Sequence, residues 1–509
     1  MVENVEVREK RGILQRWPAW LTTILLILIM TAGAALRMLG MDWDEGQHLH
    51  PDERFLTLVV TSIQPEKISK YFDTAVSTLN PHNVGHGFYV YGTLPLLFTR
   101  VVSDALGMSG YGNIYLVGRY LSALMDLLTV VLVFLAASRL FRNEKIGLLA
   151  AAFAAFSVLP IQLSHYFTVD TFSNFFSFLA IYLAIVVMTA ERQPLSGGVD
   201  AERSDFWGLL GGNWKSLLPF VGFGLALGMA VASKVNAGLI SILLPLAAWV
   251  WWRRVPAEEQ EGYFWVLFRN LVIAAIISLV VFRIFQPYAF MGPGFFGLKL
   301  NPKWIANLKE ISIISSGEAE VPYAWQWARR PLTFALKNMV IWGLGLPLGI
   351  LAWGGFLWMG WRILRGEWQK YLLLWSWTGL YFAWQSLNWV RAMRYQLLVY
   401  PTLAIIAAWF VFDIYRRRPS KLKLAWLPKA ASIGMGSLGL VLTILWAVAF
   451  FQIYTRPVTR IAASEWIYAN IPGPINLQIE SAGSLQNQPL GYHLRYLLTA
   501  ENELELVVK

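Results

Sequence analysis

The sequence predicts an all-α, polytopic membrane protein with about eleven transmembrane helices. Of its 509 residues, 56% are hydrophobic and only 14% are charged, whereas soluble domains are closer to half apolar and a quarter charged. Apolar runs that are long enough to cross a bilayer recur along the chain. The 25 Trp residues suit a protein with two interfacial belts, where indole rings are enriched. We therefore expect one large membrane domain rather than several soluble ones.

The chain divides into a basic cytoplasmic tail over residues 1–17, a membrane domain over 18–452 and a C-terminal segment over 453–509. Several predicted spans are shorter than the roughly 20 residues that a straight crossing needs, so only their approximate positions are predicted. The predicted spans are 18–38, 112–138, 146–160, 171–190, 216–233, 236–253, 266–288, 338–361, 370–388, 393–415 and 427–452. The chain contains no Cys, which excludes disulfides and thiolate metal sites.

The basic residues predict how these helices are oriented. If residues 88–106 do not cross the membrane, most Arg and Lys fall in loops on one side, as the positive-inside rule requires. If they do cross, every later loop inverts and the pattern is lost. We therefore expect a cytoplasmic N-terminus, a first outer loop over 39–111 with helices lying on the membrane, and a long outer loop over 289–337. This distribution explains the net charge of +11 without nucleic acid as a partner.

The C-terminal segment is expected outside as well. It begins with a helix-like stretch and continues with period-2 alternation, as in Ile475 to Ile479, which is typical of strands. So few residues do not make a stable β domain alone. We expect a small α/β tail, or the first part of a β domain that the chain does not complete.

The first outer loop opens with an unusual cluster of titratable residues. Five carboxylates and two His fall within fifteen residues, at Asp42, Asp44, Glu45, His48, His50, Asp52 and Glu53. Carboxylates beside a low-dielectric slab are costly unless they are paired or solvated. A solvated loop, with Pro51 and Asp52 starting a surface helix, is the simpler interpretation. Because acids are scarce elsewhere on this face, we favour a functional site.

Further candidates lie at other outer helix ends. Asp170 stands between two spans, where it could cap a helix or act in a site. Lys234, Arg391 and Arg394 lie on the side that disfavours cations, and they could snorkel to the interface. We favour binding of a phosphate, above all for Arg391 and Arg394, which we expect one helical turn apart. Asp126 lies within a span, and we expect it to pair with a neighbouring helix.

Five motifs together resemble the C-type glycosyltransferase superfamily, in particular the bacterial relatives of protein O-mannosyltransferases and of the lipid A aminoarabinose transferase. The resemblance covers roughly residues 18–455, and the order and common sidedness of the motifs carry it. They are the Asp-Glu pair in His50-Pro51-Asp52-Glu53, the Gly/Pro/Tyr-rich stretch from His86 to Leu96, the segment from Asn113 to Asn143, the outer Asp170, and RAMRYQLLVYP from Arg391 to Pro401.

This resemblance implies an enzyme that transfers a sugar from a polyprenyl-phosphate carrier on the outer face of a bacterial cytoplasmic membrane. The acceptor hydroxyl would belong to a protein, a lipid or a glycan. By the matching motif, Asp52 is the catalytic base, with Glu53 beside it and Asp170 as a second acid; Asp44 and Glu45 form the alternative base pair. Substrate and phosphate binding would fall to Lys234, Arg391, Arg394, His86, Tyr91 and Tyr395.

The chemistry expected of such a site is a single displacement that inverts the anomeric carbon, by analogy with inverting hydrolases. The leaving phosphate needs no general acid if cations neutralise its charge. We expect no cofactor; the alternative is a divalent metal held by Asp44, Asp52 and His50. The alternative function is a transporter or flippase of a lipid-linked or anionic substrate, which would need charged residues near the bilayer midplane and broken helices in symmetric positions.

Overall fold

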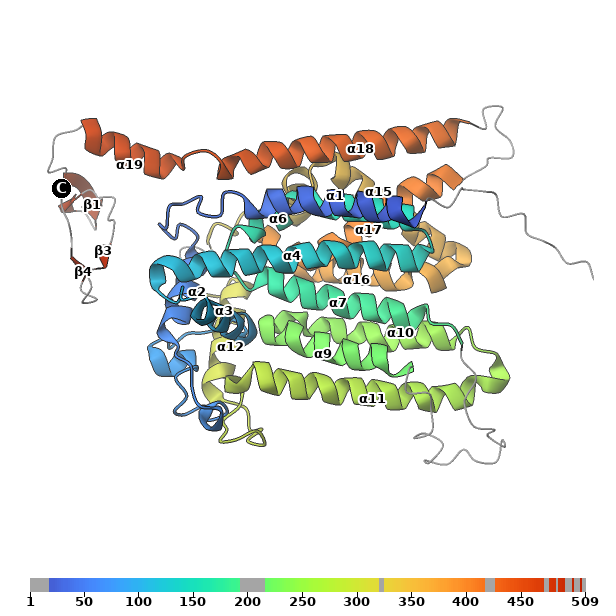
Figure 1. The fold of residues 1–509 in the computed structure, drawn as a ribbon, viewed down its shortest axis with the longest axis horizontal. Helices are drawn as coiled ribbons and strands as arrows, with labels where there is room; N and C mark the ends of the chain where they lie inside the picture. The colour runs from blue at the N-terminus through green and yellow to red at the C-terminus, as the bar shows by residue number, and fades with distance from the viewer. Residues whose placement is uncertain are drawn as a thin grey trace, which may run out of the picture.

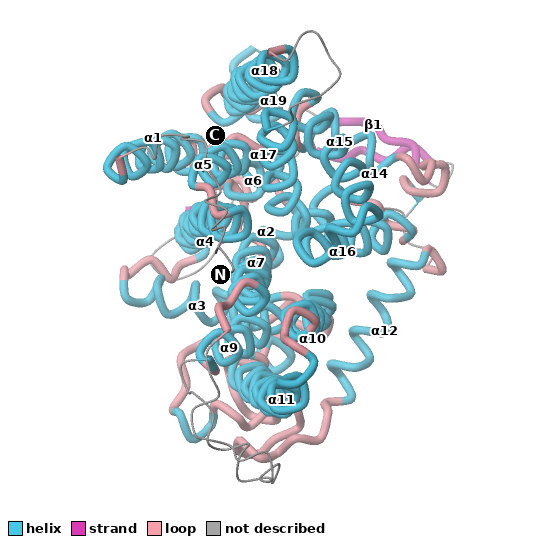
Figure 2. Tube along the Cα trace, turned by 90° about the vertical axis from the view of Figure 1, so that its right-hand side faces the viewer, coloured by secondary structure: helices cyan, strands magenta, loops and turns pink. Residues whose placement is uncertain are grey.

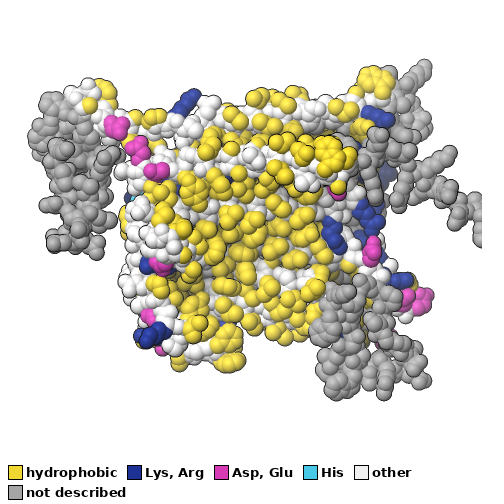
Figure 3. Space-filling model, in the orientation of Figure 1, with side chains coloured by type: hydrophobic (Ala, Val, Ile, Leu, Met, Phe, Trp, Pro, Cys, Tyr) yellow, Lys and Arg dark blue, Asp and Glu magenta, His cyan; other side chains and the backbone are white. Residues whose placement is uncertain are grey.

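The long helices of the protein run side by side, and short helices gather at one end of the bundle (Figures 1 and 2). The computed structural model describes residues 18–192, 216–319, 325–416, 426–470, 476–481, 484–489, 497–498 and 504–505. We call the end that carries the loop between α1 and α4 the acidic-loop end, and the opposite end the arginine end. Between them, Figure 3 shows a broad band of hydrophobic side chains.

Seven described helices are long and apolar enough to cross a membrane. They are Ala19–Met38 (α1), Tyr111–Phe141 (α4), Asp170–Met188 (α7), Val235–Trp252 (η4 and α10), Ala257–Phe285 (η5 and α11), Met393–Arg416 (η9 and α17) and Leu427–Ile467, which includes α18 (Leu427–Phe451). Two further helices, Glu144–Ala155 (α5) and Val158–Ser164 (α6), meet at 56° and count as an eighth crossing if they form one broken span.

The predicted number of eleven spans is therefore not confirmed. Three predicted spans correspond to helices that fall short by length or composition. Helix α9 (Leu218–Ser233) has 16 residues and α15 (Leu346–Arg362) has 17. Helix α16 (Trp368–Leu387) has 20 residues, but its Gln, Lys, Tyr and Trp side chains make it less apolar. Next to α15 lie α14 (Phe334–Asn338) and the π-helical turns η7 (Met339–Gly343) and η8 (Ile363–Glu367).

The first loop packs across the acidic-loop end as short helices. It contains α2 (Pro51–Ser62), η1 (Ile68–Lys70), η2 (Pro81–Val84) and α3 (Thr93–Ala105). With 13 residues, α3 is too short to cross a bilayer, and it lies at the end of the bundle (Figure 1). This agrees with the expectation that residues 88–106 do not span. The absolute orientation in the membrane stays a prediction.

The long loop after α11 docks onto the first loop through polar contacts. It carries η6 (Pro287–Ala289) and α12 (Pro302–Ser316). The hydroxyls of Ser77 and Tyr288 lie 2.9 Å apart, and Asn307 Oδ1 lies 2.8 Å from His82 Nε2. Since these bonds join residues more than 200 positions apart, the two loops form one layer over the helix ends.

Within the bundle, a buried ion pair fixes the break between α5 and α6. Arg37 of α1 pairs with Asp126 of α4 at 2.6 Å, and neither side chain is more than 3% exposed. The same guanidinium donates to the carbonyl oxygens of Ala154 and Ala155, the last two residues of α5. The expectation that Asp126 has a partner on a neighbouring helix is thus confirmed.

The chain ends in η10 (Gln452–Tyr454), α19 (Thr459–Asn470) and four short strands. β1 (Asn476–Ser481) pairs antiparallel with β2 (Ser484–Pro489), and β3 (Leu497–Leu498) pairs with β4 (Leu504–Glu505). These pairs do not amount to a described domain, so the α/β tail stays a prediction. The residues of the predicted basic tail, 1–17, lie outside the described part of the chain.

Candidate active site

Helix α2 begins inside the acidic cluster, and its first turn sends the two acids in different directions. His50 is the N-cap and its Nδ1 accepts the backbone N–H of Glu53, while Pro51 occupies the first turn. The Glu53 side chain is fully buried, whereas 21% of the Asp52 side chain is exposed. Of the two neighbouring acids, Asp52 is the one that a substrate can reach.

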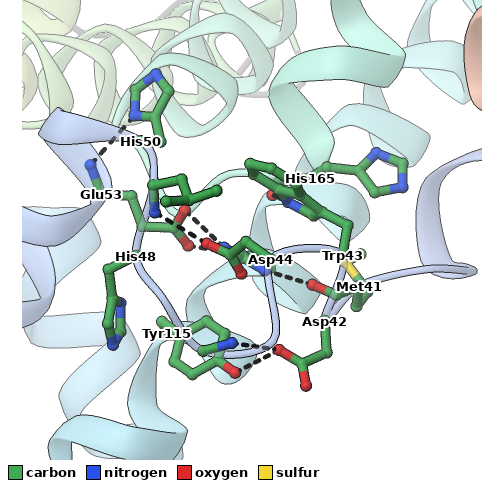
Figure 4. Close-up of polar contacts among 12 residues, drawn as sticks. Met41, Asp42, Trp43, Asp44, His48, His50, Glu53, Tyr115 and His165 are labelled. Carbon is green, nitrogen blue, oxygen red and sulfur yellow. Dashed lines mark hydrogen bonds and ion pairs between the residues drawn. The ribbon is translucent and has the colours of Figure 1, made fainter. Parts of the chain in front are cut away.

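Arg119 of α4 is the centre of a buried cluster beneath α2. Its guanidinium donates to both carboxylate oxygens of Glu53, at 2.6 and 2.9 Å, to Asp44 Oδ1 at 2.9 Å and to the carbonyl of Met41. None of the three charged side chains is exposed, and Figure 4 shows the Asp44 and Glu53 carboxylates close together. Burial raises the pKa of Glu53, against the opposing effect of Arg119. We therefore assign Asp44 and Glu53 to holding the loop rather than to chemistry.

Two further acid–cation pairs lie side by side at the partly exposed surface of this end. Asp52 pairs with Arg394, and Asp170, at the start of α7, pairs with Lys234 at 2.7 Å. The Tyr395 ring joins them, because its centroid is 4.9 Å from Lys234 Nζ and 5.4 Å from Arg394 Cζ. The exposed fraction is 21% for Lys234 and 27% for Arg394. The structure thus brings together five of the predicted site residues; their roles stay predictions.

Burial and the neighbouring charged side chains set the protonation states of Lys234 and His50 in this cluster. Burial lowers the pKa of Lys234, but Asp170 and two nearby tyrosines raise it more, so it lies above its usual value. Burial, and then Arg394, lower the pKa of His50 to about 4. His50 is therefore neutral at pH 7, and because its Nδ1 accepts a hydrogen bond, its proton is on Nε2. Its ring stacks on Tyr166 with centroids 4.4 Å apart.

The other predicted binding residues have different contacts. Arg391 donates to the carbonyl oxygens of Ser386 and Arg330. It precedes η9 (Met393–Val399), so it does not share a helical face with Arg394, contrary to the expected one-turn spacing. The remaining residues lie against α2 or on the surface: His86 lies 3.2 Å from the Ser62 hydroxyl, Tyr91 packs against Phe55, and Glu45 is exposed.

The three candidate metal ligands do not converge. Asp44 is bound by Arg119, Asp52 by Arg394, and the Nδ1 of His50 by a backbone N–H. Across the described ranges, no three His, Asp or Glu side chains come together in a way that could hold a metal ion. The residues present do not fit the metal alternative, so the proposed mechanism contains no metal step.

A close backbone approach sets the position of Lys234 relative to the first loop. The N–H of Gly92 donates to the carbonyl of Ser233 at 3.1 Å, and a Cβ at Gly92 would lie only 1.9 Å from the carbonyl oxygen of Ala232. Only glycine leaves room for this contact. The loop therefore rests directly on the end of α9, next to Lys234.

An apolar cavity of about 340 Å³ is lined in part by a residue that neighbours one of these ion pairs in the sequence. Met393, the residue before Arg394, is one of its walls. The other lining residues come from α6, η7 and α18 or their ends: Val158, Leu159, Gln162, Trp342, Gly343, Trp446, Ala449 and Phe450. No charged side chain of the described residues lines this cavity, and Met393 is its link to the neighbouring Arg394.

The fold and part of the sequence match known proteins. Residues 105–197 match the model of the dolichyl-phosphate-mannose-protein mannosyltransferase family. The structure superimposes on an oligosaccharyltransferase from Archaeoglobus fulgidus tethered with an acceptor peptide, with a TM-score of 0.58, 15% identity and coverage of 89% of this chain and 58% of that one. The chain has the C-type glycosyltransferase fold. The predicted resemblance to this superfamily is thereby confirmed.

Two other solved structures are similar to this chain as well. The same archaeal enzyme in complex with an inhibitory peptide and a dolichol-phosphate gives a TM-score of 0.53 at 14% identity, covering 89% of this chain and 58% of that one. ArnT from Cupriavidus metallidurans bound to undecaprenyl phosphate gives 0.47 at 15% identity, covering 89% and 81%. The chain spans less than three fifths of the length of the archaeal enzyme. No curated protein matches the sequence.

Proposed function

We propose that this chain is a membrane glycosyltransferase that moves a sugar from a polyprenyl-phosphate donor to an acceptor hydroxyl. The observation that carries the proposal is the pair of neighbouring ion pairs, Asp52–Arg394 and Asp170–Lys234, joined by Tyr395. They supply an accessible carboxylate and two cations at one end of a bundle of apolar helices. A base and a phosphate site are what this transfer needs.

The two cations suit the leaving group. Arg394 and Lys234 would each bind phosphate oxygens through charge-assisted hydrogen bonds, and they would stabilise the charge that develops as the phosphate leaves. The apolar cavity beside Met393 would take isoprenoid units of the same donor. Since the phosphate competes with the carboxylates for these cations, donor binding would release Asp52 from Arg394.

The carboxylate of Asp52 would then act as the base. The acceptor oxygen attacks the anomeric carbon, the bond from that carbon to the phosphate oxygen breaks, and polyprenyl phosphate leaves with the electron pair. The hydroxyl proton passes to Asp52. One displacement of this kind inverts the anomeric configuration. Asp170 would hold Lys234 in place, and the Arg119 cluster would hold the start of α2.

Two similarities support this proposal. The matching family model is that of an enzyme that uses dolichyl-phosphate mannose, and the archaeal protein of the same fold was solved with a dolichol-phosphate. By the positive-inside rule, the basic loops support an orientation in which the acidic-loop end faces the outside of a bacterial cytoplasmic membrane, the N-terminus lies inside and the C-terminal segment lies outside. The acceptor would be a protein, lipid or glycan hydroxyl that is presented there.

The test is turnover by the full chain in lipid nanodiscs supplied with polyprenyl-phosphate sugars and cell-envelope acceptors. We expect release of polyprenyl phosphate, which falls by roughly 10²–10³ in Lys234→Met because one donor to the developing charge is lost. Asp104→Asn is a matched control, because Asp104 forms a surface pair with Arg100 away from the site. Equal rates for Lys234→Met and wild type would contradict the phosphate assignment.

A further inference from the structure

A large cavity opens at the arginine end, opposite the candidate active site. Its volume is about 1060 Å³, and the ends of α4, α7, α10, α15, α16 and α17 surround it. Figure 2 looks onto this end and shows the ends of these helices next to one another, and Figure 3 shows Lys and Arg side chains gathered along the corresponding edge. The charged residues that line it are Arg139, Arg142, Glu191, Arg254, Arg362, Arg365, Glu367, Lys370, Asp413 and Arg416.

The charges of this cavity do not balance. Seven cations face three acids, an excess of four positive charges. Two of the acids, Glu367 and Asp413, are both bound by Arg362, at 2.5 and 2.7 Å. They therefore do little to neutralise the other arginines.

Helix ends account for some of these cations. Arg254 donates to the carbonyl oxygens of Met188, at the end of α7, and of Gln369. Arg139 donates to the Thr189 hydroxyl just beyond α7. Cations beside helix C-termini are favourable because they offset the negative end of the helix dipole. Arg139 and Arg254 thus have a structural explanation.

Three arginines have no such explanation. Among the described residues, Arg142, Arg365 and Arg416 have neither a carboxylate nor a carbonyl partner. Arg365 is positioned by Trp361, with its Cζ 4.7 Å from the ring centroid. Burial, and then the like charge of Arg142, lower the pKa of Arg254, which lines the same cavity. A bound anion would offset this repulsion.

The walls of the cavity limit what that anion can be. Leu140, Phe141, Ile146, Met188, Trp409 and Phe412 line it together with the cations. A small inorganic anion would gain nothing from this apolar surface, whereas an amphiphile would use both parts. The location at a helix-bundle end, next to the hydrophobic band, fits a molecule that enters from the bilayer.

We propose that this cavity is a binding site for the phosphate headgroup of an anionic membrane lipid. Arg142, Arg365 and Arg416 contact the phosphate oxygens, and the acyl chains lie against Phe141 and Phe412. The site is separate from the sugar-transfer site and does not depend on the proposed activity. On the predicted orientation it faces the cytoplasmic leaflet, whose anionic lipids attract cations at about 1 kcal/mol each.

Native mass spectrometry of the detergent-purified full chain tests this directly. The probes are dioleoylphosphatidylglycerol and, as the zwitterionic comparison, dioleoylphosphatidylcholine. We expect wild type to retain the phosphatidylglycerol preferentially and the double variant Arg142→Gln/Arg365→Gln to retain about tenfold less. The matched control Arg192→Gln/Arg253→Gln removes the same charge from exposed arginines that do not line the cavity, and it should bind as wild type does.

Three outcomes would overturn the proposal: equal losses in the two double variants, equal retention of the two lipids, or displacement of phosphatidylglycerol by millimolar inorganic phosphate. The last would identify a free-anion site. The single variant Arg416→Gln, which removes one charge at the last residue of α17, provides the same readout if the double variant does not fold. No sugar donor is present, so a failed transferase assay leaves this result unaffected.

Discussion

Replacing Arg119 should unfold the acidic loop from the end of the bundle. Arg119→Met removes the cation that binds Glu53 and Asp44 while leaving both carboxylates fully buried. Removing one partner of a buried ion pair costs about 3–5 kcal/mol, because the remaining charge has no compensation. The cost here should reach the upper part of that range, since two acids and the carbonyl of Met41 lose the guanidinium together. Within the described part of the chain, the two carboxylates then keep only the backbone N–H groups of Leu49 and Phe167 as donors.

The assay is the apparent melting temperature of the detergent-purified protein. We expect a decrease of about 5 °C or more for Arg119→Met. Arg192→Gln is the control, because it breaks an exposed pair with Glu259, and such pairs contribute about 0–1 kcal/mol. Adding Asp44→Asn and Glu53→Gln to Arg119→Met should recover part of the loss. If Arg119→Met has the same melting temperature as the control, the cluster does not stabilise the loop and our assignment of Glu53 is wrong.

Three further predictions concern the same end of the bundle. Gly92→Ala should destabilise the protein by about 1–3 kcal/mol through its clash with α9, whereas Gly87→Ala, which meets no atom within 4 Å, should match wild type in the same melting assay. The pKa of His50 is lowered from its usual 6.5 to about 4 in the folded protein, so as the pH falls the unfolded chain takes up the proton before the folded chain does. The free energy of unfolding should therefore drop by up to about 3 kcal/mol between pH 6.5 and pH 4. His50→Asn should flatten that part of a curve of melting temperature against pH. Tyr395→Leu should lower turnover about tenfold by removing the ring between the two cations, while Tyr395→Phe should retain it; equal rates for both variants would rule out this role.

The sequence predicted the parts of the fold that depend on composition and loop charge. Apolar runs and the distribution of basic residues were enough to expect a helical membrane domain whose first loop does not cross. The members of the candidate cluster could also be predicted from the sequence, since they stand out as charges at helix ends: Asp52, Asp170, Lys234 and Arg394. Each lies where a charge needs a partner or a ligand, which is a local property of the sequence.

The partners themselves could not be predicted. Arg119 lies 66 positions after Glu53, and nothing in a single sequence joins them; its position near the start of an apolar helix, after an acid-rich loop, was the available signal. The break between α5 and α6 was missed for a different reason. Pro160, in the first turn of α6, marks it, but a continuous apolar run obscured the break. The one-turn spacing of Arg391 and Arg394 failed because the chain is not helical between them.

The most direct test of the account is the rate of sugar transfer by Asp52→Asn in a single-turnover assay with saturating polyprenyl-phosphate sugar. The amide keeps the size of the side chain but cannot accept the acceptor proton, so we predict a loss of roughly 10²–10⁴-fold in the transfer rate, with donor binding retained. Glu45→Gln, a surface acid of the same loop, should transfer at the wild-type rate. Transfer by Asp52→Asn at the wild-type rate, or loss in Glu45→Gln instead, would contradict the assignment of Asp52 as the base.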